Sequence, residues 1–257
     1  MTLTLGKKYK VKDEEREGIY IVDPYFEIPS LFEEEDGNNV VDVERLNDFV
    51  AFYSEHADVI NQLASRQFFK EYSSTGFLDR DVNPYRPYYK AACFYKVYSQ
   101  RFSDEFLLNA QYVTHWIDVD MSKETTDSLF KIAEGLVKHY AKAKMVVTSR
   151  IHAGLPCLGM GTPVVFIASP QLDSFNAPGR LEGLVELFRV LNLENAEFSC
   201  DDPVLNSVDL FTLNTTFENK NDWKPFANRL DRQLSAFMSD GFDQKSIAEI
   251  RNMAFFI

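Results

Sequence analysis

Two short apolar runs separated by a helix-sized segment constrain the fold of this chain more than any other feature. The runs span residues 145–147 and 164–167, and the segment between them opens with polar residues 148–152 and closes with Gly159 and Gly161. This order is typical of a β-α-β unit, because neighbouring parallel strands need a crossover of a dozen or more residues. We therefore predict an α/β fold, with polar side chains gathered where the first strand ends.

Other segments extend the same sheet. Residues 18–23 form a buried-strand pattern that ends in Asp23-Pro, and residues 111–116 carry a second strand signal. A helix that starts near Ser122 leads from the second signal to a strand at 145–148. Three parallel strands joined by two crossovers predict a Rossmann-like sheet with flanking helices. Asp23 then lies at a carboxyl end, where such sheets bind ligands, or it simply forms a turn.

The chain is expected to form a single α/β domain over residues 1–257. Within it, residues 110–190 form the Rossmann-like core, and residues 42–102 form a helix-rich insertion or cap with Asp42 as a helix N-cap. Residues 223–257 read as two C-terminal helices, 223–238 and 242–256. Less regular expectations are a strand at 2–5, a solvated acidic turn at 33–39 and a helix at 180–189.

Composition excludes several classes of function. The net charge is −12, which argues against broad binding of nucleic acid or anionic membranes, since both need a cationic face. The chain has no apolar run of the roughly 20 residues of a membrane span. Three cysteines without metal-type spacing fit a reducing compartment, so we expect a cytoplasmic protein that does not span the membrane.

The polar residues after the first strand of the central unit are the main candidate site. Ser149, Arg150 and His152 lie where a strand ends and a helix starts, and free backbone N–H groups favour anions there. Arg150 suits a carboxylate or phosphate, and His152 can transfer a proton near neutral pH. The alternative is an internal salt bridge for Arg150 and a packed His152. Pro156 disfavours a regular first turn, so the helix is expected to start near residue 155.

Other candidates could line the same crevice. Thr114 and His115 follow the strand signal at 111–116, and Arg180 follows a loop rich in glycine and proline. A structural role for His115 and a surface position for Arg180 are the alternatives. The spacing of His, Cys, Asp and Glu residues suggests no metal site, and glycine-rich phosphate-binding motifs are lacking, so we expect neither a metal nor a cofactor.

Several of these stretches carry a family resemblance. Residues 146–167, which contain Arg150-Ile-His152 and the second strand, resemble the polysaccharide pyruvyl transferase family. Residues 112–115, 139–143 and 180–184 look similar to the same family. The resemblance is strong over about residues 110–190, weaker before them and absent after about residue 195.

The resemblance implies a fold like the C-terminal half of a two-domain GT-B-type glycosyltransferase. It implies transfer of pyruvyl from phosphoenolpyruvate to two sugar hydroxyls in the synthesis of cell-surface polysaccharide such as capsule. By resemblance, Arg150 and His152 take the catalytic roles at the donor site, and Ser149, Thr114, His115 and Arg180 bind substrate.

Family members carry an α/β half before the region that this chain resembles. We therefore expect that the chain is a fragment, that it works with a separate partner that supplies an N-terminal half, or that it has lost activity and is inactive alone. Two alternatives stay open. One is a GT-B-type half-domain that binds a nucleotide sugar, and the other is a non-catalytic remnant.

Overall fold

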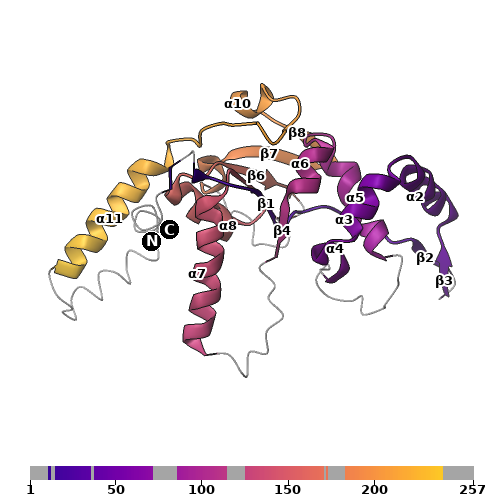
Figure 1. Ribbon diagram of the computed structural model, residues 1–257, viewed down its shortest axis with the longest axis horizontal. Helices are drawn as coiled ribbons and strands as arrows, with labels where there is room; N and C mark the ends of the chain where they lie inside the picture. The colour runs from indigo at the N-terminus through magenta and orange to yellow at the C-terminus, as the bar shows by residue number, and fades with distance from the viewer. Residues whose placement is uncertain are drawn as a thin grey trace.

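A computed structural model describes residues 11–12, 15–35, 38–71, 86–114, 125–170, 172 and 183–239. These residues form a central sheet with helices on both faces (Figure 1). The strand expected at 2–5 and the helix expected at 242–256 lie outside the described residues.

The sheet has six strands in the order β4-β1-β5-β6-β7-β8. All neighbouring pairs are parallel except β7 and β8, which pair antiparallel. This arrangement confirms the predicted α/β fold with a Rossmann-like sheet. The strands are β1 (Ile19–Val22), β4 (Gln111–Val113), β5 (Met145–Thr148), β6 (Val164–Ala168), β7 (Arg189–Glu194) and β8 (Glu197–Ser199).

In the sheet, β1 lies between β4 and β5. In the sequence, β4 and β5 are consecutive strands of the described chain, and α7 (Thr126–Lys142) lies between them. Ile21 aligns with Tyr112 on one side and with Val147 on the other. The crossover helix α7 therefore connects two strands that are not neighbours. As a result, the end of β1 lies between the ends of β4 and β5.

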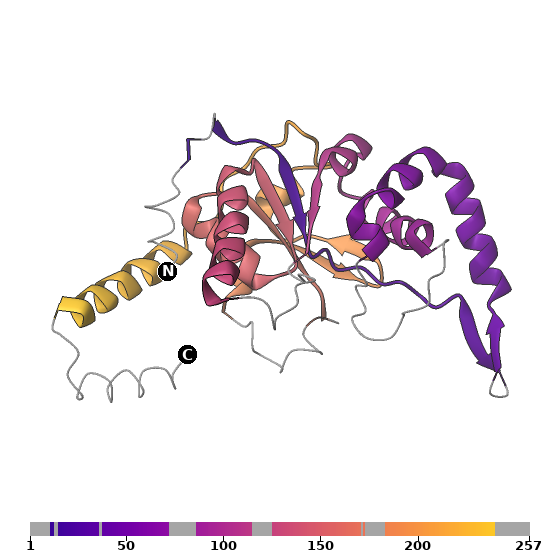
Figure 2. The same cartoon turned by 60° about the horizontal axis from the view of Figure 1, so that its bottom comes forward.

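The strands separate two hydrophobic cores, because alternate side chains of a strand face opposite sides of the sheet. Val146 of β5 packs in one core with α7 and the crossover helix α8 (Ile151–Met160). Val147 of β5 packs in the other core with helices from the first half of the chain. Figure 2 shows the two groups of helices on either side of the sheet.

The described part of the region predicted to be helix-rich, residues 42–71 and 86–102, is largely helical. Asp42 caps the first helix as predicted, since its carboxylate accepts a hydrogen bond from the Arg45 N–H at 2.9 Å. The rings of Phe94 and Tyr98, both fully buried, stack with centroids 4.3 Å apart and join this region to the sheet core. The helices are α2 (Val43–Glu55), α3 (Ala57–Ala64), α4 (Gln67–Glu71), α5 (Arg86–Tyr98) and α6 (Asp104–Asn109).

The turn expected over residues 33–39 is wrong for residues 33–35 and 38–39, which lie in strands, whereas the exposed Glu33 and Asn38 agree with the expected solvation. Residues Phe32–Glu35 form β2 and residues Asn38–Val41 form β3, and the two strands pair antiparallel as a separate sheet. The reason is local, because Phe32, Val40 and Val41 are strand-forming side chains and an Asp-Gly pair between two such runs is a hairpin signal.

Helix α8 starts earlier than expected. It begins at Ile151 with Arg150 as its N-cap residue, and Pro156 lies inside it. Proline lacks one backbone donor, but the first turn buries Ile151 and Ala153 in the core, and this burial offsets the lost bond. Gly161, in the left-handed region at φ +75°, ends the helix as its position predicts.

The helix expected at 180–189 is wrong in its described part. Residues Val185–Leu187 form a single 3-10 turn, and Arg189 starts strand β7. Phe188 is buried, and it lies between the turn and the strand. Alternating buried residues Leu191 and Leu193 favour a strand over a helix here.

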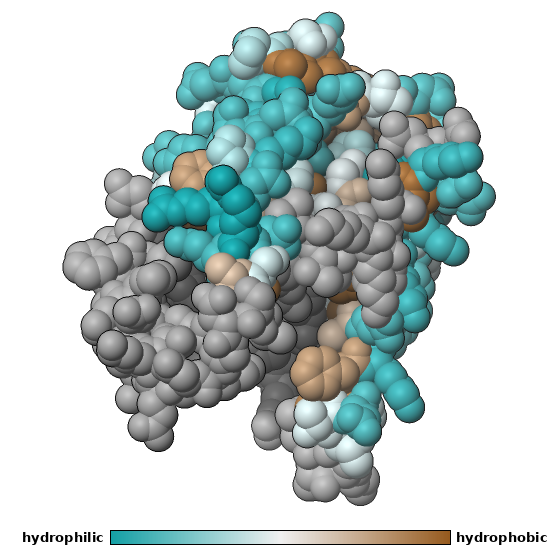
Figure 3. Space-filling view, turned by 90° about the vertical axis from the view of Figure 1, so that its left-hand side faces the viewer, coloured by the Kyte–Doolittle hydropathy of each residue, from teal (hydrophilic) through white to brown (hydrophobic). Residues whose placement is uncertain are grey.

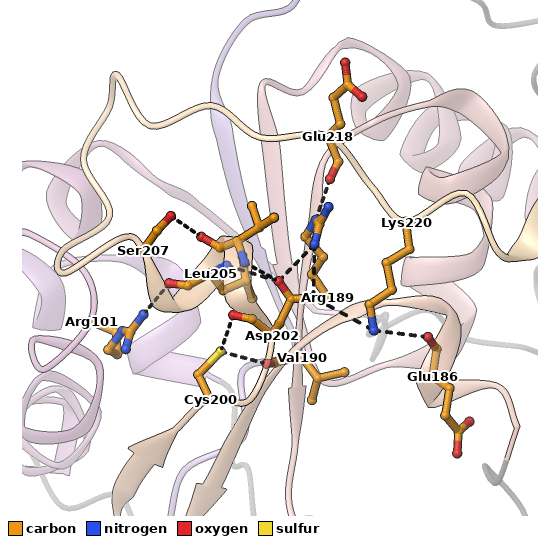
Figure 4. Close-up of polar contacts among 11 residues, drawn as sticks. Arg101, Glu186, Arg189, Val190, Cys200, Asp202, Leu205, Ser207, Glu218 and Lys220 are labelled. Carbon is orange, nitrogen blue, oxygen red and sulfur yellow. Dashed lines mark hydrogen bonds and ion pairs between the residues drawn. The ribbon is translucent and has the colours of Figure 1, made fainter.

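A buried carboxylate anchors the segments that follow the sheet (Figure 4). Asp202 caps the short helix α10 (Pro203–Asn206) and also pairs with Arg189 of β7, with Nη1 2.9 and 3.0 Å from the two carboxylate oxygens. Lys220 Nζ lies 3.9 Å from the same carboxylate. This cluster fixes the chain after β8 against β7.

The predicted helix at 223–238 is confirmed as α11 (Trp223–Ser239). It extends away from the sheet (Figure 1) and exposes Phe226, Leu230 and Leu234. Figure 3 faces this side, and its described surface is mostly hydrophilic with scattered hydrophobic side chains. Neither α7, α11 nor any other described helix has the length and apolar character needed for a membrane crossing.

Candidate functional site

The candidate site lies at the carboxyl edge of the sheet, where the parallel strands β4, β1, β5 and β6 end next to one another. Thr114 follows β4, Asp23 follows β1, Ser149 follows β5 and Ser169 follows β6. Parallel neighbours end on the same side of a sheet, and open α/β sheets bind ligands outside those ends. The strand order therefore sets four polar residues along one edge.

The turn between β5 and α8 is fixed to β1 by a buried hydroxyl. Thr148, the last residue of β5, donates a hydrogen bond from Oγ1 to the Val22 carbonyl at 2.9 Å. The same oxygen accepts the Arg150 N–H at 3.0 Å. The direction in which the chain leaves β5 is thus set before the helix begins.

Ser149 makes a second connection to β1. Its hydroxyl is buried and donates a hydrogen bond to the Asp23 carbonyl at 2.7 Å. A serine hydroxyl has one proton to donate, so Ser149 holds the turn and keeps only acceptor capacity for other groups. Its predicted contact with substrate stays a prediction.

Arg150 is both paired and accessible. Its Nε lies 3.7 Å from Oδ2 of Asp23, whose side chain is 1% exposed, while the Arg150 side chain is 45% exposed. The sequence left open whether Arg150 forms an internal salt bridge or is available to an anion. In the structure Arg150 pairs with Asp23 and is also accessible to solvent. One side of the guanidinium faces the carboxylate of Asp23, which follows β1, and about half of the side chain is exposed to solvent.

His152 is the second residue of α8, and its side chain is exposed. The alternative in which His152 packs inside the protein is wrong. The imidazole of His152 and the guanidinium of Arg150 are thus both exposed near the start of the helix. This geometry suits proton transfer to a bound anion.

Backbone groups add positive character at the same place. The N–H groups of Ala153 and Gly154 donate to the Arg150 carbonyl at 3.1 and 3.0 Å, which are the first bonds of the helix. The N–H groups of Ile151 and His152 come before those bonds, at the positive end of the helix dipole. Anions bind favourably at such helix starts.

The remaining predicted site residues are more distant or lie outside the described part. Thr114 is half-buried at the end of β4, on the far side of β1 from Ser149. His115 and Arg180 lie outside the described residues. The structure thus brings Ser149, Arg150 and His152 together at one turn and leaves Thr114 further along the same edge.

Two polar residues at this edge, Ser169 and Tyr25, were not singled out from the sequence. Ser169 follows β6 and is buried, and its side chain hydrogen-bonds to the phenol of Tyr25. Burial and the charge of Glu27 raise the pKa of Tyr25, and the bond to Ser169 lowers it. Ser169 occupies the same position after β6 as Ser149 after β5, and that sequence signal could have identified it.

The cysteine of the central helix does not contribute to the site. Cys157 is fully buried in α8, and burial raises the pKa of its thiol well above the usual value. The thiolate is the reactive form of cysteine, so this residue is a core side chain. Within the described residues, no three His, Cys, Asp or Glu side chains are grouped in a way that could hold a metal ion.

The fold and this edge define a Rossmann-like α/β protein with a polar strand-to-helix turn at its ligand-binding edge. Residues 20–170, from β1 through β6, match the family model described as polysaccharide pyruvyl transferase. The chain belongs to the polysaccharide pyruvyl transferase family. The match confirms the family resemblance over residues 20–170 and does not include the similar stretch at 180–184. No curated protein and no solved structure matches the chain significantly.

Proposed function

We propose that the turn between β5 and α8 binds phosphoenolpyruvate, and that the protein transfers the pyruvyl unit to two hydroxyls of a saccharide. The family membership supports this reaction class. The main structural support is the exposed guanidinium of Arg150 at the start of a helix, two residues before the exposed His152. The product would be a ketal on a cell-surface polysaccharide.

The donor carries a carboxylate and a phosphate, and the turn offers groups for either anion. Arg150 presents planar N–H donors that match both groups. The first N–H groups of α8 add donors and a positive potential without any side-chain entropy cost. Thr148 and Ser149 hold this turn against β1, so the donors are positioned before a ligand arrives.

The transfer has a simple proton balance. The enol methylene of phosphoenolpyruvate gains a proton and becomes a methyl group. One sugar hydroxyl then attacks the neighbouring carbon, phosphate leaves, and the second hydroxyl closes the ketal. One hydroxyl proton balances the proton gained by carbon, and the other leaves with phosphate. We assign His152 to deliver a proton to the enol carbon or to the departing phosphate.

Calorimetry with phosphoenolpyruvate tests the donor site directly. Arg150→Ala is expected to weaken binding roughly 10–100-fold, because it removes hydrogen bonds to a charged group. His152→Ala is expected to lower the transfer rate by a larger factor than it lowers affinity. Arg232→Ala, which removes an exposed arginine of α11, is the matched control and should bind like the parent. Equal affinity of the parent and Arg150→Ala would contradict the donor-site assignment.

Turnover is a separate measurement from binding. Enzymes that resemble the GT-B type react between two Rossmann-like halves, so we propose that turnover needs a second Rossmann-like half to supply the other wall of the site. Transfer to a saccharide acceptor is therefore to be measured with the chain alone and with candidate partner halves. Donor binding by the chain alone, with transfer only after a partner is added, is the expected result.

A second candidate uses the same helix start. A helix N-terminus also binds the diphosphate of a nucleotide sugar, as in a glycosyltransferase half-domain. Thermal shifts with nucleotide sugars, but none with phosphoenolpyruvate, would favour this candidate. The absence of any shift with both ligand classes would favour a non-catalytic role.

A further inference from the structure

A buried carboxylate stands directly behind the arginine of the candidate site. Asp23 has a side chain that is 1% exposed, and its Oδ2 lies 3.7 Å from Arg150 Nε. Burial of a carboxylate is costly unless it is paired with a charge or hydrogen-bonded. A negative charge at this place would also repel an anionic substrate. A carboxylate here is therefore expected to help binding in some other way that offsets the repulsion.

The backbone of Asp23 is held on both sides. Its N–H donates to the Val113 carbonyl of β4 at 2.9 Å, and its carbonyl accepts the Ser149 hydroxyl at 2.7 Å. Its φ is +43°, in the left-handed region that few residues other than glycine adopt. Such backbone strain persists only where the surroundings fix it, and it is concentrated at functional sites.

We propose that Asp23 is the positioning residue for Arg150. Its carboxylate holds the guanidinium from the Nε side, so that the outer donors face the incoming anion. A long, exposed arginine would otherwise lose side-chain freedom when a ligand binds, and prior pairing reduces that loss. The proposal rests on the proposed function for the identity of the anion. It adds Asp23, the residue that follows β1, to a site formed by the turn between β5 and α8.

Positioning and simple electrostatics predict opposite results when the charge is removed. Asp23→Asn keeps the size of the side chain, and asparagine tolerates the left-handed backbone. Positioning predicts that affinity for phosphoenolpyruvate falls, roughly 2–10-fold for one side chain that must now be ordered on binding. Electrostatics alone predicts tighter binding, because a like charge is gone. Unchanged or tighter binding overturns the proposal.

Glu27→Gln is the matched control. Glu27 is an exposed carboxylate on the same segment after β1, so this variant removes one negative charge near the edge without altering the pair with Arg150. Its affinity should equal or slightly exceed that of the parent. In an Arg150→Ala background, Asp23→Asn should cause no further loss. A full additional loss there would show that Asp23 acts through the fold, which also overturns the proposal.

A measurement without ligand separates this proposal from the proposed function. The side-chain Nε–H resonance of Arg150, assigned by its loss in Arg150→Ala, should shift in Asp23→Asn and stay in place in Glu27→Gln. If the parent binds no phosphoenolpyruvate, the proposed function fails, while this resonance still tests the pairing. Where Asp23→Asn does not fold, Asp23→Gly replaces it, because glycine adopts positive φ without strain. A resonance that does not move in the folded variant overturns the positioning role.

Discussion

At the scale of single residues, the crossover helix depends on a position that has no room for a side chain. A Cβ on Gly154 would lie 2.7 and 2.9 Å from two ring atoms of Phe188. Phe188 is fully buried and stacks on Phe166 of β6, with ring centroids 4.9 Å apart. The missing side chain lets α8 pack close to the segment that enters β7, which outweighs the low helix propensity of glycine.

Gly154→Ala is expected to destabilise the protein by about 1–3 kcal/mol, because the added methyl group forces a buried ring to move. Urea unfolding measures this change. Gly135→Ala in α7 is the matched control, since nothing lies within 4 Å of its Cβ position. That control should be neutral or stabilising by up to about 1 kcal/mol. Equal changes in the free energy of unfolding for the two substitutions would show that the contact with Phe188 does not restrict the side chain at position 154.

At the scale of elements, one buried arginine joins the ends of α7 and α8. Arg16 donates to the Ala141 carbonyl at 2.8 Å and to the Met160 carbonyl at 3.1 Å. It also donates to the Thr162 hydroxyl at 2.8 Å, which in turn donates to the Tyr140 carbonyl. A cation at two helix C-termini satisfies carbonyls that have no partner within the helix and complements both helix dipoles.

Arg16→Ala is therefore expected to lower the free energy of unfolding by about 2–4 kcal/mol, since it leaves several buried acceptors without their donor. Arg16→Lys should have an intermediate effect, because it keeps the charge but loses the planar fork. The control is Lys138→Ala on the exposed surface of α7, where the pair with Glu134 contributes at most about 0.5 kcal/mol. A cost for Arg16→Ala as small as that of Lys138→Ala would contradict the joining role.

At the scale of the whole molecule, the helical region and the sheet share one core that contains a buried amine. Lys90 of α5 is 1% exposed and donates a hydrogen bond to the Phe68 carbonyl at 2.9 Å. Its Nζ also lies 4.5 Å from the centroid of the Phe68 ring. Burial, and to a lesser degree the charge of Arg86, lower the pKa of Lys90 to about 7.

The stability of the protein should depend on pH through Lys90. Between about pH 7 and the ordinary lysine pKa of 10.5, the folded state carries a neutral amine and the unfolded state binds a proton. The unfolded state therefore binds more protons, and the contribution of Lys90 to stability rises with pH across this window. Lys90→Met should remove this rise, so the free energy of unfolding of the parent relative to that of the variant, measured by urea unfolding, should increase from pH 7 to pH 9.5.

The control for this pH dependence lies on the same helix. Lys96 of α5 is exposed, so Lys96→Met should leave the slope of stability with pH unchanged. A constant difference between the parent and Lys90→Met at both pH values would show that the amine keeps its charge when buried.

Local pattern was sufficient to predict much of the fold and the strand end at which the candidate site residues lie. The apolar runs at 145–147 and 164–167 became β5 and β6, and Asp42 and Gly161 cap helices as expected. These features depend on residues close in the sequence, so the sequence contains the information that determines them. Where local signals competed, the predictions failed. The acidic residues at 33–36 led us to predict a turn where β2 and β3 form a hairpin. Pro156 led us to predict a later start for α8 than the one observed.

The residues of the strand end were predictable from local pattern, since an apolar run ends at Thr148 and the polar residues Ser149, Arg150 and His152 follow it, but the start of α8 at Ile151 was not predicted. The position of β1 between β4 and β5, which brings the buried Asp23 to Arg150, became known from the folded structure alone. The physical reason is that strand order depends on pairing and packing between distant segments. The candidate site thus combines a turn determined by local sequence with a carboxylate placed by the order of the strands.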